Sequence, residues 1–217
     1  MGRMAAMGME TPPDVCFSCP LSLFPSGTLT PMQEDIDRVL ISRERIALRV
    51  AEVARLITDD FTRGKAREIT LVPILTGSII FVADLIRLLP IRMQIRLVSI
   101  SSYRGATTSS RGALIRDELS NLPQSLAGAH VLVIDDILDS GRTLDLVTGL
   151  LLEKQPAAIK TCVLLRKLRP QVMNLPVDYV CFDVPDEFVV GYGLDYNGWY
   201  RNLPEIVTLR PPVVQNG

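Results

Sequence analysis

The chain has no excess of charge of either sign. It carries 23 Lys and Arg residues against 24 Asp and Glu residues, which gives a net charge of −1. Proteins that bind nucleic acid or anionic membranes through their overall field usually carry a basic surplus. We therefore expect no nucleic-acid or membrane partner, and any anion must be held by local geometry.

Cysteine and histidine are scarce. Cys16, Cys19, Cys162 and Cys181 are too few and too scattered for a disulfide scaffold in a chain of 217 residues. A reducing cytoplasm is the expected location. Cys16 and Cys19 form a C-x-x-C pair, but the single histidine, His130, is far away in sequence, and a zinc site needs four ligands. An ordinary pair in a weakly ordered segment is the simpler interpretation.

Long hydrophobic runs are also missing. The longest uncharged run, residues 69–83, has a polar Thr-Gly-Ser in its middle and falls short of the roughly 20 apolar residues of a membrane span. The N-terminus shows no signal-peptide pattern, and Ala6 stands where a myristoylation motif requires Ser or Thr. We expect no membrane segment and no targeting segment.

The composition that remains predicts one domain behind a short extension. Residues 1–33 are rich in Met, Pro and small residues without periodicity, which predicts a weakly ordered extension. The hydrophobic content of 47% suffices for one core but not for two, so residues 34–217 are expected to form a single domain.

Strand-like and helix-like segments alternate along this domain. Ser42 is a suitable N-cap, with Glu44 in the first turn, for a helix whose apolar stripe ends near Asp59. Five nearly continuous β-branched runs predict strands buried on both faces. We therefore expect an α/β fold with a mostly parallel central sheet flanked by helices. The expected strands are residues 68–75, 95–103, 130–136, 159–165 and 177–184, and the further helices are residues 78–89 and 143–154.

Residues 101–118 interrupt this pattern with a small, polar, Gly-punctuated segment. A loop of that length within a compact domain is usually either disordered or a functional lid, and the composition alone does not choose between them.

The stretch VLVIDDILDSGRTL, residues 131–144, joins paired carboxylates to a possible anion-binding turn. If residues 131–134 form a central strand, Asp135 and Asp136 lie at its carboxyl end, where open α/β sheets bind ligands. The pair could accept hydrogen bonds from vicinal hydroxyls or hold a divalent metal, and the start of the next helix could hold a phosphate. A sugar phosphate suits both halves; the alternative is a strand end and an ordinary turn. The phosphate donors would come from Ser140, Gly141, Arg142 and Thr143.

The same stretch resembles the phosphoribosyl pyrophosphate (PRPP) loop of the type I phosphoribosyltransferases. The likeness extends over about residues 35–209 to the hypoxanthine-guanine branch, through VPILTGSIIFVADLIR, ISSYRG, LLRKL and VPDEFVVGYGLDYNGWYRNLPEI. It implies a small hood formed by terminal segments, a flexible lid at about residues 101–118, and a homodimer or homotetramer. The implied reaction, in purine salvage, moves the phosphoribosyl group of PRPP to N9 of hypoxanthine or guanine, with Mg²⁺ as cofactor, and gives IMP or GMP and pyrophosphate.

For the base, the resemblance assigns five residues. Asp139 matches the acid that takes the purine ring-nitrogen proton while N9 attacks the ribose. Lys167 matches the donor to the exocyclic O6; because an ammonium has no acceptor, it favours 6-oxopurines over adenine. Phe188 would stack on the purine, the Val189 backbone would read its edge, and Ile137 would close the other side.

For PRPP, the resemblance adds the remaining roles. Thr76, Gly77 and Arg201 would bind pyrophosphate, in a loop that often contains a non-proline cis peptide. Asp195 and Asp135 would hold the magnesium ion. Ser102 and Tyr103 would start the lid, which excludes water from the transition state. The ribose and 5-phosphate would be held by Asp135, Asp136, Asp139, Ser140, Gly141, Arg142 and Thr143.

Three positions depart from the family pattern. Asp135 stands where many relatives have Glu, Thr76 where some have Lys, and Arg142 where others have Lys. None removes a group that the chemistry requires. The Thr76 change is expected to weaken PRPP binding or to loosen contacts between subunits.

Two alternatives remain from the sequence. An RNA-interacting transcriptional regulator of the same fold would have an aromatic residue in place of Asp139 and a basic face, neither of which this chain shows. A xanthine-preferring phosphoribosyltransferase is the second alternative, since side chains alone do not rank hypoxanthine, guanine and xanthine.

Overall fold

A computed structural model describes residues 31–99, 125–211 and 213 of the chain. The chain divides into two compact units, residues 1–34 and residues 35–217. Of the first unit the structure describes one short helix, α1 (Pro31–Glu34). The predicted lid, with Ser102 and Tyr103, and most of the predicted extension lie outside the described residues.

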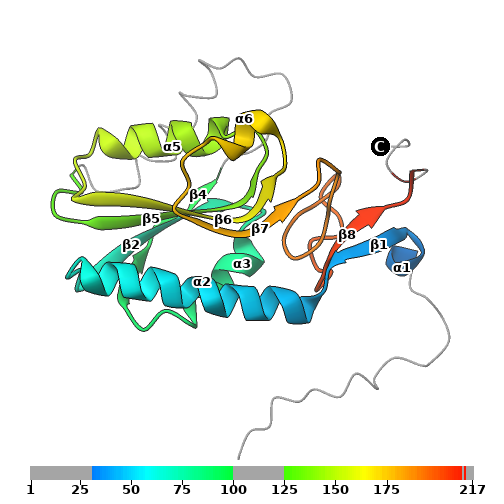
Figure 1. Cartoon of the computed structure of the whole chain (residues 1–217), viewed down its shortest axis with the longest axis horizontal. Coiled ribbons are helices and arrows are strands. Elements are labelled where there is room, and N and C mark those ends of the chain that lie inside the picture. The colour runs from blue at the N-terminus through cyan, green and yellow to red at the C-terminus, as the bar shows by residue number, and fades with distance from the viewer. Residues whose placement is uncertain (1–30, 100–124, 212, 214–217) are drawn as a thin grey trace, which may run out of the picture. The chain divides into compact units, whose positions relative to one another are not determined.

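A parallel sheet with helices on both faces forms the centre of the second unit, as the sequence predicted. The strand order is β3-β2-β5-β6-β7, and every neighbouring pair along this path is parallel. Figure 1 shows α5 over one face of the sheet and α2 and α3 over the other. The strands are β2 (Glu68–Leu75), β3 (Arg92–Ile95), β4 (Val98–Ser99, beside β2), β5 (His130–Leu138), β6 (Ala158–Lys167) and β7 (Tyr179–Val184).

The first long helix, α2 (Arg43–Arg63), begins where the sequence placed it but ends later. Ser42 is the N-cap, and its hydroxyl accepts a hydrogen bond from the Arg45 N–H at 3.4 Å. The predicted end near Asp59 is wrong, because Phe61 continues the buried stripe one turn beyond Ile57 before the helix stops at Gly64. The other helices are α3 (Ile79–Ile86), α5 (Arg142–Leu152) and α6 (Pro170–Met173).

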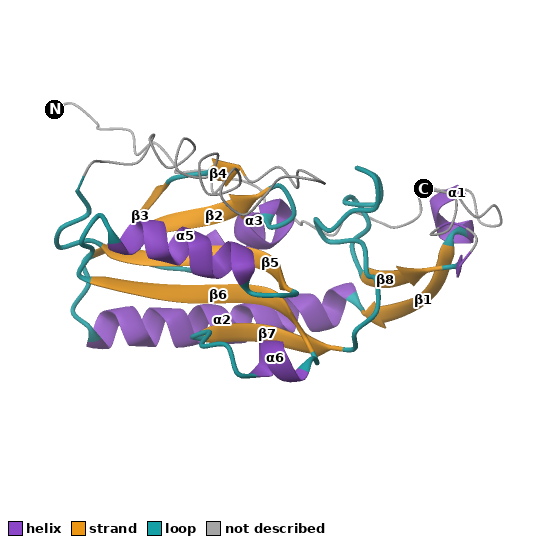
Figure 2. Cartoon of the chain, turned by 90° about the horizontal axis from the view of Figure 1, so that it is seen from above, coloured by secondary structure: helices purple, strands orange, loops and turns teal. Residues whose placement is uncertain are grey.

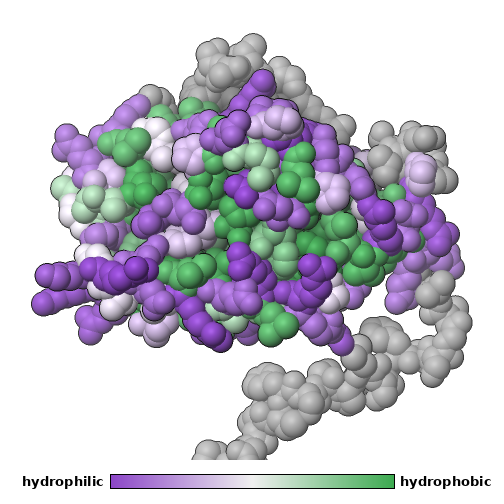
Figure 3. Space-filling view, viewed as in Figure 1, coloured by the Kyte–Doolittle hydropathy of each residue, from purple (hydrophilic) through white to green (hydrophobic). Residues whose placement is uncertain are grey.

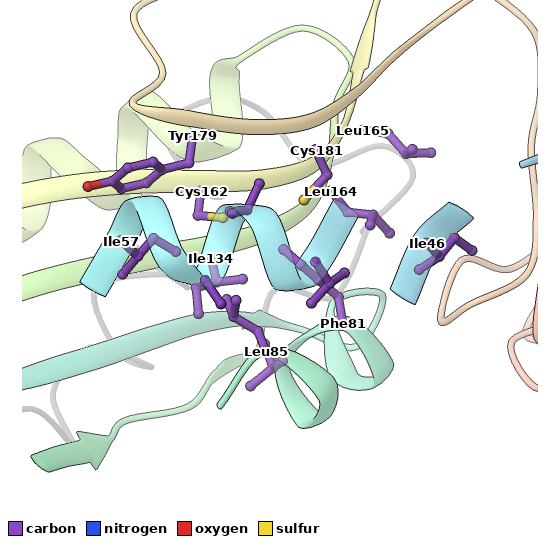
Figure 4. Packing of buried hydrophobic residues seen from close by; sticks show 14 of the residues in the cluster. Ile46, Ile57, Phe81, Leu85, Ile134, Cys162, Leu164, Leu165, Tyr179 and Cys181 are labelled. Carbon is purple, nitrogen blue, oxygen red and sulfur yellow. The ribbon is translucent and has the colours of Figure 1, made fainter. Parts of the chain in front are cut away.

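Two hydrophobic cores fill the space between the sheet and its helices. Along β5, Leu132 and Ile134 face the core under α2 and α3, whereas Val131 and Val133 face the core under α5. Because successive side chains of a strand point to opposite faces, burial on both faces accounts for the continuous apolar run. Figure 4 shows part of the first core, in which labelled side chains from α2 and α3 meet others from β5, β6 and β7.

A polar side chain of α2 is hydrogen-bonded to the backbone of β7. Arg49 of α2 donates to the carbonyl oxygens of Cys181 and Val180, at 2.8 and 3.0 Å. These two hydrogen bonds tie α2 to β7, the last strand of the sheet. On the side of the molecule drawn in Figure 3, hydrophobic side chains gather in the middle, with hydrophilic ones around them.

The predicted strand at residues 95–103 is partly wrong. The structure has two short strands instead, with Arg96 and Leu97 between them, and residues 100–103 lie outside the described part of the chain. β3 lies at the sheet edge, where three of its four side chains are exposed. An edge strand needs no continuous apolar run, so its first residues gave no strand signal.

A second, two-stranded antiparallel sheet pairs β1 (Ile36–Ile41) with β8 (Ile206–Leu209). We call it the hood sheet. It joins segments from opposite ends of the second unit (Figure 2), as the family resemblance implies for a hood. The pattern of residues missed both strands, because charged side chains interrupt β1 and β8 has only four residues. No helix among the described residues is long and apolar enough to cross a membrane.

Candidate active site

The carboxyl ends of β2, β5 and β6 lie at the same edge of the sheet, because these strands are parallel neighbours. The segments that follow them, residues 76–78, 139–141 and 168–169, therefore meet there, together with the long loop after β7. Ligands of open α/β sheets bind at this edge. Nearly all described site residues predicted from the sequence lie in these segments, in the loop after β7 or at the carboxyl ends of these strands.

The acidic pair lies inside β5 rather than after it. The strand continues to Leu138 because β6 still pairs with Ile137 and Leu138, so its predicted end was two residues short. Asp135 accepts a hydrogen bond from the Asp136 N–H at 3.0 Å, and Asp136 accepts one from the Ile137 N–H at 2.8 Å. Burial, and then the neighbouring Asp136, raises the pKa of Asp135 well above its usual range. A buried carboxylate at Asp135 next to a half-buried one at Asp136 favours a ligand that brings hydrogen-bond donors or a cation.

Gly77 lies directly against this acidic pair. A Cβ atom at Gly77 would lie 1.5 Å from Oδ2 of Asp136, so no larger residue fits without moving the carboxylate. The preceding peptide, between Leu75 and Thr76, is cis. On the other side, Gly193 has a φ of +104°, and its Cβ would lie 2.1 Å from the carbonyl oxygen of Gly77. The loop at residues 76–78 is thus held between Asp136 and Gly193.

Arg201 and Asp195 form one unit beside this loop. An Nη2 of Arg201 lies 2.7 Å from Oδ1 of Asp195, and Nη1 donates to the Gly193 carbonyl oxygen at 2.6 Å. The other carboxylate oxygen of Asp195 accepts from the Gly198 N–H at 2.7 Å. Burial raises the pKa of Asp136, and hydrogen bonds from Asp135 and the backbone, together with the charge of Arg201, oppose that rise.

The start of α5 offers free backbone donors. Gly141 is the N-cap with a φ of +75°, and no side chain caps the helix. The first N–H groups of a helix lack partners within it and suit a phosphate. The lack of a side chain at Gly141 also lets Leu175 pack closely against this turn, since a Cβ at Gly141 would lie 2.2 Å from Cδ1 of Leu175. Ser140 and Arg142 are exposed and Thr143 is half-buried at this turn.

Lys167 ends β6 in a largely buried position, with 5% of its surface exposed. Its ammonium donates to the carbonyl oxygen of Glu187 and lies 3.9 Å from Oδ1 of Asp186. Burial lowers the pKa of Lys167, and Asp139 and Asp186 oppose that effect. The lysine is therefore held by groups that sequence reasoning did not single out.

Phe188 is not a core residue. Its exposed fraction is 49%, and its ring meets that of Tyr196 edge-on at 5.4 Å between centroids, whereas Val189 is buried and Ile137 is half-buried. A pocket of about 400 Å³ opens beside Phe188 and is completed by residues of the hood sheet, among them Asp37 and Thr208. That volume is in the range of small-molecule sites.

Asp139 is ion-paired with Arg169, a residue that the sequence gave no reason to select. Arg169 lies with Nη1 at 3.1 Å from Oδ1 of Asp139, and its Nη2 donates to Asp186. The structure thus forms two groups. Thr76, Gly77, Asp136, Asp195 and Arg201 lie around the 76–78 loop, and Asp139, Lys167, Arg169, Asp186 and Glu187 form the second group.

The carboxylates that could bind a metal ion lie on more than one segment. In the part of the chain that the structure describes, no three His, Cys, Asp or Glu side chains gather as a ready-made metal site. Mg²⁺ commonly takes one or two carboxylates and completes its shell with water and substrate phosphates. The buried Asp135 and the ion-paired Asp195 fit that pattern.

Comparisons with known proteins show what the chain as a whole is similar to. The model of the phosphoribosyl transferase domain family matches residues 42–197. The chain is 39% identical to the hypoxanthine-guanine phosphoribosyltransferase of Mycobacterium avium, over 88% of this chain and 97% of that protein. It is 37% identical to the enzyme of the same name from Streptococcus pneumoniae, over 85% and 99%. A solved structure of Trypanosoma cruzi hypoxanthine phosphoribosyltransferase complexed with the product IMP matches with a TM-score of 0.73 at 35% identity, over 84% of this chain and 96% of that chain.

Proposed function

Because the chain belongs to the phosphoribosyltransferase family, in its hypoxanthine-guanine branch, we propose that it transfers the 5-phosphoribosyl group of PRPP to N9 of hypoxanthine or guanine. The products are IMP or GMP and pyrophosphate. The observation that carries this proposal is the close contact between the carboxylate pair at the end of β5 and the tight backbone loop at Gly77. A separate carboxylate and lysine, Asp139 and Lys167, lie on the loop after β5 and at the end of β6. The first group suits a phosphorylated sugar, and the second suits a 6-oxopurine.

The sugar phosphate would be bound along β5 and the start of α5. Asp135 and Asp136 offer carboxylate oxygens to the two ribose hydroxyls, and burial strengthens such hydrogen bonds because water does not compete. Further along the chain, the open N-terminus of α5 offers N–H groups to the 5-phosphate, with side-chain donors from Ser140, Arg142 and Thr143.

The base would be bound between the loop after β5 and the end of β6. Lys167 donates to O6, and Asp139 takes the ring-nitrogen proton as the N9–C1 bond forms and the bond from C1 to pyrophosphate breaks. Phe188 is exposed enough to stack on the purine, with Ile137 opposite and the Val189 backbone at the edge of the ring.

The leaving pyrophosphate would be bound by the backbone of Thr76 and Gly77 and by Arg201, which can offer two parallel N–H groups to an anion. Mg²⁺ would be held by Asp135 and Asp195, and when bound it would neutralise charge on the pyrophosphate oxygens. The Arg201–Asp195 ion pair places the proposed pyrophosphate ligand next to the proposed metal ligand.

The proposal also covers the domain boundaries, the lid, the oligomeric state and the location of the protein. We assign residues 1–33 to an extension and residues 34–217 to one phosphoribosyltransferase domain, with Ser102 and Tyr103 at the start of a lid. A homodimer or homotetramer in the cytoplasm is the expected form.

The product assay that tests this function also tests the metal. Purified protein is incubated with PRPP, hypoxanthine and Mg²⁺, and IMP and pyrophosphate are quantified by chromatography. Equal amounts of the two products are expected, and a chelator should abolish both, with recovery on adding Mg²⁺. PRPP consumption without IMP, or an unchanged rate in chelator, contradicts the proposal.

Lys167→Gln is expected to relax the choice of base. A glutamine amide has an acceptor as well as donors, so it no longer disfavours the 6-amino group of adenine. We expect kcat/KM for hypoxanthine to fall about tenfold or more, in line with the loss of a hydrogen bond to a charged group, while the ratio of adenine to hypoxanthine turnover rises. The measurement is kcat/KM for both bases in parent and variant, and an unchanged ratio contradicts the role of Lys167.

A further inference from the structure

Arg169 connects the loops that follow three neighbouring strands. It lies just after β6, its Nη1 is 3.1 Å from Oδ1 of Asp139 after β5, and its Nη2 donates to Oδ1 of Asp186 after β7. The same Nη1 lies 3.4 Å from the backbone carbonyl oxygen of Asp139. One guanidinium therefore contacts both the side chain and the main chain of the proposed proton acceptor.

This contact leaves the two carboxylate oxygens of Asp139 in different situations. Oδ1 is held by Arg169, whereas no described residue donates to Oδ2. The side chain of Asp139 is 52% exposed, so packing alone does not restrict its rotation. When one oxygen of a carboxylate is anchored, the other oxygen points in a fixed direction. Accepting a proton from a bound base requires such a fixed orientation.

Asp186 holds the other end of Arg169. Its hydrogen bond with Arg169 lowers the pKa of Asp186, and the same bond raises the pKa of Arg169. Both groups stay charged, and a planar guanidinium fixed at one nitrogen has little freedom at the other. With Lys167 and Asp139, these side chains make two cations and two carboxylates, so their charges balance before a base enters. Glu187 contributes its carbonyl oxygen to Lys167, and its own carboxylate is paired with Arg38.

We propose that Arg169 is a positioning residue for phosphoribosyl transfer, which holds Asp139 by one carboxylate oxygen so that the other faces the ring nitrogen of the purine. This inference rests on the proposed function, and within it on the role of Asp139. Arg169 acts through Asp139 and does not itself contact the reacting atoms.

The first experiment separates turnover from binding. Arg169→Gln should lower kcat with hypoxanthine by between about tenfold and hundredfold, the loss typical of a displaced catalytic group, with KM for PRPP changed less than about twofold. Arg169→Lys should recover part of kcat, since a lysine can reach one carboxylate but not hold both. The matched control is Arg166→Gln. Arg166 lies on β6, three residues before Arg169, and its ion pair with Asp183 of β7, at 2.6 Å, contains no proposed site residue, so the variant should keep the parental kcat.

A double-mutant cycle with Asp139→Asn then tests the route of the effect. If Arg169 acts through Asp139, Arg169→Gln should cost less than about twofold in the Asp139→Asn background, because the group it positions is already lost. An equal loss in both backgrounds, or parent kcat in Arg169→Gln, overturns the inference. Should Arg169→Gln fail to fold, Asp186→Asn releases the same guanidinium from its other end and should give the same pattern.

Failure of the proposed function looks different, because the parent protein itself would then form no IMP from PRPP and hypoxanthine. If Asp139→Asn alone retains the parental rate, the role of Asp139 falls, and with it the inference. If Asp139→Asn loses turnover and Arg169→Gln does not, only the inference fails.

Discussion

Asp139→Asn is expected to lower kcat by about 10²- to 10⁴-fold, the usual contribution of general acid–base catalysis, with PRPP binding kept. Asparagine has nearly the same shape, but its amide cannot accept the ring-nitrogen proton. The phosphate turn that begins at Ser140 and the acidic pair are unchanged by the substitution. The measurements are kcat with hypoxanthine and the Kd for PRPP by calorimetry.

The control for this variant is Asp59→Asn, an exposed carboxylate near the end of α2, on an element outside the site. It should match the parent in both measurements. A parental rate in Asp139→Asn would remove the role of Asp139 as proton acceptor, and a loss of PRPP binding as large as the loss of rate would assign it to sugar binding instead.

Gly77→Ala is expected to remove most PRPP-dependent activity. The added Cβ would lie 1.5 Å from Oδ2 and 2.5 Å from Cγ of Asp136, so the carboxylate must leave its place. Because Asp136 is a proposed ribose ligand, we expect kcat/KM for PRPP to fall by about a hundredfold or more, the effect of displacing a group by an ångström or so. Saturation curves in PRPP at fixed hypoxanthine give this value directly.

Gly149→Ala is the matched control. Gly149 lies within α5, and a Cβ there would meet nothing within 4 Å. Alanine in a helix is more stable than glycine by roughly 0.5–1 kcal/mol, so this variant should melt slightly higher and keep the parental kinetics. Parental kcat/KM for PRPP in Gly77→Ala would show that the 76–78 loop does not hold Asp136 in a functional position.

The central sheet could be predicted because its strands are buried on both faces. β2 begins and ends at the residues expected from its apolar run, Glu68 and Leu75. β5 was predicted too short, because acidic residues usually end a buried strand, and the backbone pairing of Ile137 and Leu138 with β6 is invisible in the sequence. Burial pattern thus predicts where a strand lies better than where it ends.

The residues alone pointed to the part of the candidate site whose members are neighbours in sequence, and the distant members came from the family resemblance. The run from Asp135 to Thr143 forms one strand end and one helix start, so a single motif contains it. Arg169 meets its carboxylate partners 30 and 17 residues away, and only the sheet topology brings them together. The close approach of Gly193 to Gly77 likewise depends on the loop after β7 folding back, which no local pattern encodes.

The choice of base is the central claim, and a side-by-side rate measurement tests it most directly. Purified protein with PRPP and Mg²⁺ is assayed spectrophotometrically on hypoxanthine, guanine, xanthine, adenine and uracil at equal concentrations. We expect turnover with 6-oxopurines, hypoxanthine or guanine foremost, and little or none with adenine and uracil, because Lys167 offers only donors at the O6 position. Turnover of adenine at a rate comparable to hypoxanthine, or no turnover with any base despite measurable PRPP binding, would contradict the account.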